Sequence, residues 1–273
     1  MLYADYLTTS ETNRWILDTD IEWDAIDPHR ALAQPEILER IRNSALIESF
    51  FPIFTPRALD LLWDNVTATA IYSVQLYESY KHFHVFNLYL EAVHYRPVTD
   101  AEIVEIRRRN LGLKYDCPTR LLTRYMMSEH FAAHSFFKDS RKAREPVLKH
   151  ILHLVAKDEV RHCQFAYELL AQKLQQRPRE VECVLEEAAN FHHIGELVVA
   201  ELPIAEKNDF AAIVAVNQKI QRLTGRGVQT NHPEHRVAAD TGRTGGLPSN
   251  VQDRRQSEES RFCAGSAPSP HDE

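Results

Sequence analysis

The sequence predicts an all-α protein, and three observations support this prediction. Only eight of the 273 residues are glycine, and six of these lie from Gly225 onward, so the preceding chain has few of the tight turns that sheets need. Apolar residues before Gly225 recur every three or four positions, which is the spacing of one helix face. No stretch of useful length alternates apolar and polar residues with the period of two that marks a strand.

Composition excludes several classes of protein. The hydrophobic fraction of 44% can support a core, and no stretch approaches the ~18 uncharged apolar residues of a membrane helix. A net charge of −7 with scattered Lys and Arg predicts neither a nucleic-acid partner nor a membrane-surface partner. The N-terminus lacks a signal-peptide profile, and the four cysteines show no CxxC pair. We therefore expect a cytoplasmic protein with reduced thiols.

Most of the predicted helices begin at a proline, which is tolerated in the first turn. Pro35 opens the first helix and Pro52 ends it. Pro56 opens a second helix, expected to continue to about His94 over ~55 Å. Five more helices are predicted over residues 101–110, 118–137, 144–176, 178–202 and 208–223. We expect one helical domain over residues 1–223.

The last segment, residues 224–273, changes character. It is rich in Gly, Pro, Ser and Arg and has no apolar periodicity. Such a segment buries too little surface to offset the entropy lost on ordering, so we predict a disordered tail.

Carboxylates occupy positions in the apolar stripes where a core residue is expected. Glu159 and His162 lie in the middle of the stripe of helix 144–176, within the run DEVRH. Glu129 interrupts the stripe of helix 118–137, and Glu48 that of the first helix. An ionised carboxylate buried without a partner costs several kcal/mol, so each of these positions needs a compensating charge.

The spacing of these residues repeats. Glu129 precedes Glu159 by 30 residues and His162 by 33. Glu48 precedes position 79 by 31 residues and His82 by 34. Di-iron carboxylate bundles take one Glu from each of two helices and Glu-x-x-His from each of the other two. Oxygen and imidazole ligands suit iron or manganese. Five of the six expected ligands are present: Glu48, His82, Glu129, Glu159 and His162.

These segments resemble the ferritin-like di-iron oxidases. ESYKHFHVFNLYLEAV (residues 78–93) resembles ligand-binding oxidases related to the ribonucleotide reductase small subunit. ESFFP (48–52), YMMSEHFAAH and the segment containing DEVRH resemble soluble acyl-ACP desaturases. The resemblance implies a ferritin-like four-helix bundle core with additional helices, two irons or a manganese–iron pair, and O2 as co-substrate. It also implies an external electron donor (a ferredoxin or a reductase), a small-molecule or acyl-carrier substrate, and a homodimer.

One position departs from the family pattern. Both branches carry Glu-Glu-x-x-His, whereas this chain has Glu78-Ser79-Tyr80-Lys81-His82. Serine is a poor iron ligand, and a local helix adjustment could let Glu78 serve as the sixth ligand. The competing interpretation is a single-metal or inactive site in which Glu78 points outward. Ser79, Asp158 and His134 are expected around the ligands, with Asp158 accepting a hydrogen bond from a ligand histidine.

Three functions are compatible with these residues. The leading hypothesis is an O2-activating oxidoreductase, an oxygenase or a desaturase, acting on an apolar substrate. The second is a metal- or ligand-binding protein without turnover, because Ser79 replaces a ligand. The third is a structural bundle whose buried acids pair with Arg161, Lys157 or Arg124. A further cluster on helix 178–202, formed by His192, His193 and Glu196, has metal-friendly spacing, but we interpret it as a polar patch where this helix packs over the bundle.

Overall fold

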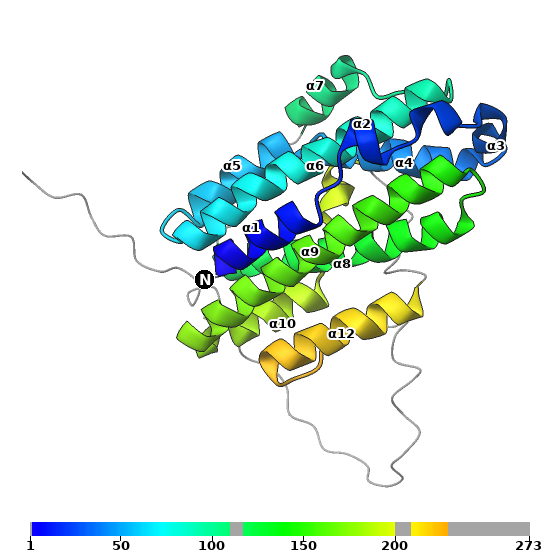
Figure 1. The fold of residues 1–273 in the computed structure, drawn as a ribbon. Helices are drawn as coiled ribbons and strands as arrows, with labels where there is room; N and C mark the ends of the chain where they lie inside the picture. The colour runs from blue at the N-terminus through cyan, green and yellow to red at the C-terminus, as the bar shows by residue number, and fades with distance from the viewer. Residues whose placement is uncertain (1, 110–116, 200–208, 229–273) are drawn as a thin grey trace, which may run out of the picture.

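A computed structural model describes residues 2–109, 117–199 and 209–228 of the chain. All regular structure within these ranges is helical, which confirms the all-α prediction (Figure 1). The α-helices are α1 (Leu2–Thr12), α2 (Leu17–Asp20), α3 (Pro28–Leu32), α4 (Pro35–Glu48), α5 (Phe51–Leu61), α6 (Val66–Ala92), α7 (Asp100–Arg109), α8 (Pro118–Lys142), α9 (Pro146–Gln176), α10 (Val181–Ala189) and α12 (Phe210–Thr224). Short 3-10 helices cover Trp23–Ala25, Pro178–Glu180 and Ile194–Leu197.

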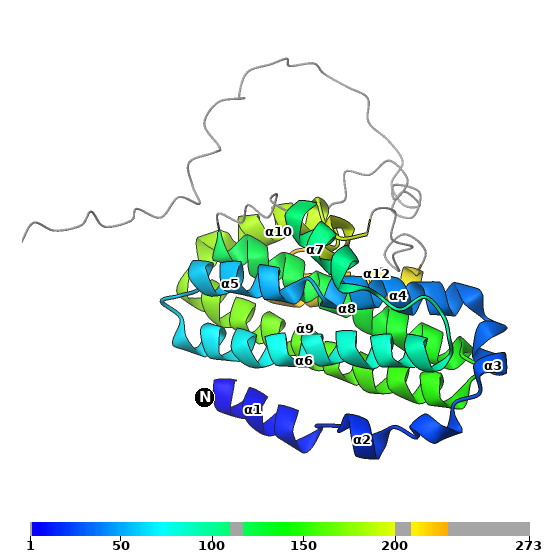
Figure 2. The ribbon, with the colours of Figure 1, turned by 90° about the horizontal axis from the view of Figure 1, so that it is seen from above.

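Four long helices form a bundle. α8 and α9 are joined by residues 143–145 and pack along each other as a hairpin, while α4 packs on α6 and α6 on α9. Arg40 of α4 makes two hydrogen bonds to Asp139 of α8, at 2.7 and 2.8 Å, which link the remaining pair of helices. Figure 2 shows these helices running side by side, with α1 and α2 along the outer side of α6 and α9.

Prolines and capping side chains mark the N-termini of the long helices. Proline occupies the first turn of α4, α8 and α9, where its missing N–H costs nothing. The Asn65 side chain caps α6 by accepting a hydrogen bond from the Ala68 N–H at 3.0 Å. Glu145 caps α9 in the same way through the Leu148 N–H at 2.6 Å.

The prediction of one helix from Pro56 to about His94 is wrong. The structure has two helices, α5 and α6, separated by residues 62–65. The Asn65 N–H donates to the Leu62 carbonyl at 2.8 Å, and the Asn65 side chain then opens α6. An asparagine that caps a helix competes with the helical backbone, so the chain turns here although the apolar pattern continues.

The predicted helix over 178–202 is also too long. α10 ends at Ala189, and the Asn190 side chain donates to the Glu186 carbonyl at 2.9 Å beyond the last turn. The helices before Pro35, α1 to α3, were not predicted. α12 ends at Thr224 and is followed by the C-cap Gly225, which has a left-handed conformation with φ 71°. The predicted tail lies mostly outside the described residues.

The apolar core has charged groups at its centre. Glu48, Glu78, His82, Glu129, Asp158, Glu159, Arg161 and His162 are all at most 7% exposed. They lie at one level of the bundle, since contacts between them join α4, α6, α8 and α9. Among the described helices, none combines the length and the apolarity that crossing a membrane requires.

Candidate metal centre

Five of the residues predicted as metal ligands converge in the middle of the bundle. They form two groups in which the ligand atoms lie within 4.8 Å of one another. The His82 group contains Glu48, His82 and Glu159, and the His162 group contains Glu129, Glu159 and His162. Each of the five residues is at most 6% exposed. The two groups therefore share Glu159 and draw on all four helices of the bundle.

Glu159 lies between the two histidines. Its Oε1 is 3.0 Å from His82 Nδ1, and its Oε2 is 2.9 Å from His162 Nδ1. Glu48 Oε2 is 4.0 Å from His82 Nδ1, and Glu129 Oε2 is 3.5 Å from His162 Nδ1. Each histidine thus faces a shared carboxylate and a carboxylate of its own, so the two groups are arranged alike.

Three buried atoms of the His82 group lack hydrogen-bond partners in the structure: Glu48 Oε2, His82 Nδ1 and Glu159 Oε1. Buried polar atoms are nearly always hydrogen-bonded, so unpaired atoms that face one another need an explanation. A cation would satisfy all three at once. Carboxylate oxygen and imidazole nitrogen are ligands that iron, manganese and zinc accept, and the donor set therefore fits the predicted metal.

The far nitrogen of each histidine faces a carboxylate. His82 Nε2 lies 3.1 Å from Asp158 Oδ2, which is the position predicted for Asp158. His162 Nε2 lies 2.9 Å from Glu78 Oε2. Arg161 joins the two carboxylates, at 3.0 Å from Asp158 and 2.5 Å from Glu78. When the Nε2–H is held in this way, the lone pair of Nδ1 points toward the centre.

Glu78 does not take the position of a sixth ligand, which corrects the sequence expectation. Its carboxylate accepts hydrogen bonds from Tyr6 Oη at 2.7 Å and from Arg161, and it lies behind His162. The preceding position on a helix is rotated by ~100°, which turns Glu78 toward α1 and α9 rather than toward Glu48. Glu78 therefore has the same position behind His162 that Asp158 has behind His82.

Ser79 occupies the position where the family pattern has the sixth ligand. Its side chain is buried, and its Oγ accepts a hydrogen bond from Gln75 Nε2 at 2.6 Å. The Ser79 side chain also hydrogen-bonds the Glu48 carboxyl, which lowers the Glu48 pKa in opposition to burial. Ser79 therefore lies next to the predicted ligand Glu48, and it adds no negative charge to the centre.

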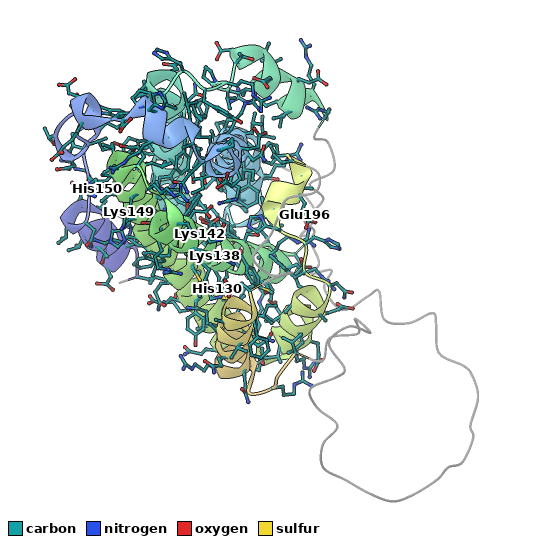
Figure 3. The ribbon with its side chains drawn as sticks, turned by 90° about the vertical axis from the view of Figure 1, so that its right-hand side faces the viewer. His130, Lys138, Lys142, Lys149, His150 and Glu196 are labelled. Atoms are coloured by element: carbon teal, nitrogen blue, oxygen red, sulfur yellow. The ribbon has the colours of Figure 1, made fainter. Side chains whose placement is uncertain are left out.

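His134 does not lie against the ligands, contrary to expectation. Its ring packs on His130 at 4.5 Å between centroids, and His130 Nε2 donates to the Ala212 carbonyl of α12 at 2.9 Å. Figure 3 shows His130 next to α12, at the outer side of α8. His192 is exposed and pairs with Glu196 at 3.2 Å, whereas His193 is half-buried and its Nε2 lies 3.2 Å from the Ser128 carbonyl of α8.

The charges of the centre favour ionised Glu159 between protonated partners. Burial opposes ionisation of Glu159, but a hydrogen bond from Glu129 and the two histidines hold its pKa well below the usual value. The pKa of His82 is raised to about 9, because Glu159 and Asp158 outweigh the effect of burial. Burial and the Glu159 charge raise the pKa of Glu48 to about 8 and that of Glu129 well above its usual value. Protons therefore compete with cations for this site.

Among the described residues, no arginine or lysine forms an ion pair with the three central acids. In the described part of the chain, the ion pairs of Glu48, Glu129 and Glu159 are all with His82 or His162. Arg161 pairs with Glu78 and Asp158 instead, and Arg124 with Glu187 of α10. The structural hypothesis named Arg161, Lys157 and Arg124 as partners of the buried acids, and in the described ion pairs Arg161 has this role for Glu78 and Asp158 but not for the three central acids.

Sequence reasoning missed two residues of this network. Tyr6 reaches Glu78, and Trp15 Nε1 donates to Asp158 Oδ2 at 2.8 Å. Both lie in the N-terminal segment, which carries no helix-period stripe long enough to reveal its packing. Arg161 had a visible signal, because its place in DEVRH is one residue from His162.

Similarity to known proteins does not identify a function for this chain, so the function is argued from the chemistry of these residues. No protein-family model matches the chain, and no curated protein matches it.

Proposed function

We propose that this protein is an O2-activating oxidoreductase with two metal ions, either two irons or a manganese–iron pair, in a ferritin-like bundle. The observation that supports this proposal most strongly is the position of Glu159, whose two oxygens face the Nδ1 atoms of two buried histidines. A carboxylate that spans two histidine-containing groups suits a pair of cations held close together.

The residues of the chain have distinct roles in this proposal. The His82 group would hold one ion and the His162 group the other, with Glu159 shared. Such a metal pair supplies electrons to O2 and the oxidising power to attack an unactivated C–H or N–H bond. Asp158 and Glu78 keep the Nε2 protons in place and so orient the imidazoles. Burial of the five ligands keeps bulk water away and limits side reactions.

A small cavity adjoins His162 and bears on the substrate. It has a volume of about 10 Å³ and is lined by residues that include Tyr6, Tyr125, Gln75 and Phe165. That volume suits one water-sized molecule. At this cavity the described conformation therefore has room for no more than one water-sized molecule, and a larger substrate requires an opening of the wall. Because the centre is buried, we further propose that a ferredoxin or a reductase delivers electrons from outside.

The test is O2 uptake by protein loaded anaerobically with Fe(II) and supplied with excess reductant. The proposal predicts O2 uptake that requires iron and is lost in Glu159→Gln. Glu187→Gln is the matched control, since Glu187 is also buried (5% exposed) but pairs with arginines of α8 rather than with the centre. Equal O2 uptake by the wild type and Glu159→Gln would remove the assignment.

A second function is favoured by one observation, the serine at position 79. With three carboxylates around the centre instead of four, the protein could bind metal without turnover. This alternative predicts normal metal uptake with no O2 uptake above that of free iron. Ser79→Glu distinguishes the two proposals, because it confers O2 uptake only if the missing carboxylate is what prevents turnover.

A further inference from the structure

We infer that docking of the N-terminal segment, residues 2–15, is coupled to metal binding at the centre. The docked segment raises the metal affinity, and bound metal favours the docked segment. The inference rests on the metal centre proposed above and concerns how that centre is closed and held.

The segment supplies one hydrogen-bond donor to each half of the centre. Tyr6 Oη donates to Glu78 Oε2 at 2.7 Å, and Glu78 is the acceptor behind His162. Trp15 Nε1 donates to Asp158 Oδ2 at 2.8 Å, and Asp158 is the acceptor behind His82. Both carboxylates that orient a ligand histidine are thus themselves oriented from the same short segment.

Few residues of α1 pack against the rest of the protein. Of the 11 residues of α1, only Leu2, Tyr6 and Ser10 are buried. An isolated helix of this length is marginal in water, so α1 depends on its docking contacts. Among these contacts, the ring of Tyr6 packs edge-on against Phe165 with 4.4 Å between the ring centroids. Figures 1 and 2 show α1 as an outer layer on α6 and α9.

The other end of the segment is fixed at Trp15. Lys81 Nζ donates to the Trp15 carbonyl at 2.8 Å and lies 3.7 Å from the centre of its ring. Trp15 is 4% exposed, and its ring stacks on His82 at 6.4 Å. The segment is therefore attached at two points, and each point is one hydrogen bond away from a carboxylate that holds a ligand histidine.

The centre is closed in this conformation. The five ligands are at most 6% exposed, and Tyr6 forms part of the wall of the cavity beside His162. A cation can enter only if part of this wall moves. α1 lies outside α6 and α9, buries only Leu2, Tyr6 and Ser10, and contributes Tyr6 to this wall, so we assign the opening to its release.

Metal binding favours the docked segment for a physical reason. A cation binds only where both imidazoles direct Nδ1 toward it, and a well-oriented carboxylate behind each Nε2–H holds the ring in that orientation. Tyr6 and Trp15 provide that orientation. Because coupling between two binding equilibria is reciprocal, a docked segment must raise metal affinity by the same factor by which metal favours docking.

The experiment measures both sides of this coupling on the full-length protein. Hydrogen exchange of residues 2–15 is followed without metal and with Co(II), and Co(II) affinity is measured by calorimetry for Tyr6→Phe and Trp15→Phe. Tyr77→Phe and Trp63→Phe are the controls, since Tyr77 is 60% and Trp63 78% exposed. We expect at least ~10-fold slower exchange with Co(II). We also expect ~10-fold weaker Co(II) binding in Tyr6→Phe and Trp15→Phe, the low end of the effect of losing a partner of a ligand histidine, because Tyr6 and Trp15 act through Glu78 and Asp158. The controls should bind as the wild type does.

The outcomes separate the two proposals. If the wild type binds two Co(II) ions while the exchange of residues 2–15 is unchanged, the coupling is refuted and the metal centre stands. The same conclusion follows if Tyr6→Phe and Trp15→Phe both bind Co(II) with wild-type affinity. If the wild type binds no metal, the proposed function and this inference fail together. The exchange measurement uses only the wild type, so it decides the question even if a variant does not fold.

Discussion

Raising the pH should destabilise the metal-free protein, and bound metal should remove that dependence. The pKa of His82 is raised to about 9, above the value of ~6.5 for an unfolded histidine, because Glu159 and Asp158 favour its charged form against the effect of burial. The folded state therefore binds this proton more tightly. The resulting stability is fully present below pH ~6.5 and is lost as the pH rises through about 9.

The size of the effect follows from the pKa difference. One pKa unit corresponds to ~1.4 kcal/mol, so a difference between ~6.5 and about 9 amounts to about 3 kcal/mol for His82. Glu48 acts in the same direction, since burial and Glu159 raise its pKa to about 8 and folding favours its protonated form. His82 and Glu48 face each other and share this effect, so we take about 3 kcal/mol for the pair. A domain stable by ~5–15 kcal/mol loses a measurable part of its stability.

The assay is urea unfolding at a series of pH values between ~6 and ~9.5, with EDTA and separately with Mn(II). Metal displaces the protons from its ligands, so the loaded protein should lose little stability over this range. His82→Gln should flatten the metal-free curve. His150→Gln should leave it unchanged, since His150 is exposed at the outer face of α9 (Figure 3). A metal-free wild type that is as stable at pH ~9.5 as at pH ~6 would refute the reasoning.

Three further predictions concern single side chains. Ser79→Glu should lower the melting temperature of the metal-free protein, because it adds a buried carboxylate. It should also raise the Mn(II) affinity by ~10-fold or more, on the order of 1.4 kcal/mol. An unchanged affinity in calorimetry would contradict the position assigned to Ser79. Asn65→Ala should cost ~1 kcal/mol in urea unfolding, because it removes the cap of α6, whereas Asn65→Asp should be nearly neutral. Arg40→Met should destabilise the fold by ~3 kcal/mol, since it leaves the buried Asp139 without its two hydrogen bonds, and Arg40→Met with Asp139→Asn should recover part of that loss.

Much of the bundle could be predicted from local chemistry. Proline and the apolar stripe locate α4, α8 and α9, and the carboxylates within those stripes mark Glu48, Glu129 and Glu159 as members of the centre. These signals are strong because a buried charge in a helix stripe is costly and therefore uncommon. The break between α5 and α6 was missed, because one capping asparagine outweighed a continuous apolar pattern.

The second layer of the centre could not be predicted from spacing. Helical periodicity fixes direction only within tens of degrees, and Glu78 and Ser79 are neighbours on the chain that face different partners. Tyr6 and Trp15 reach the centre through a segment 72 and 143 residues away in sequence from the carboxylates they contact. Such contacts depend on tertiary packing of a short helix, which carries little information in its own sequence.

The central claim is that two cations share Glu159, and calorimetric titration with Fe(II) under anaerobic conditions tests it most directly. We expect two ions per chain for the wild type, one for Glu48→Gln and one for Glu129→Gln, because each of these changes disables one group. Glu159→Gln should lose both. A wild type that binds no iron, or a Glu159→Gln variant that still binds two ions, would contradict the claim.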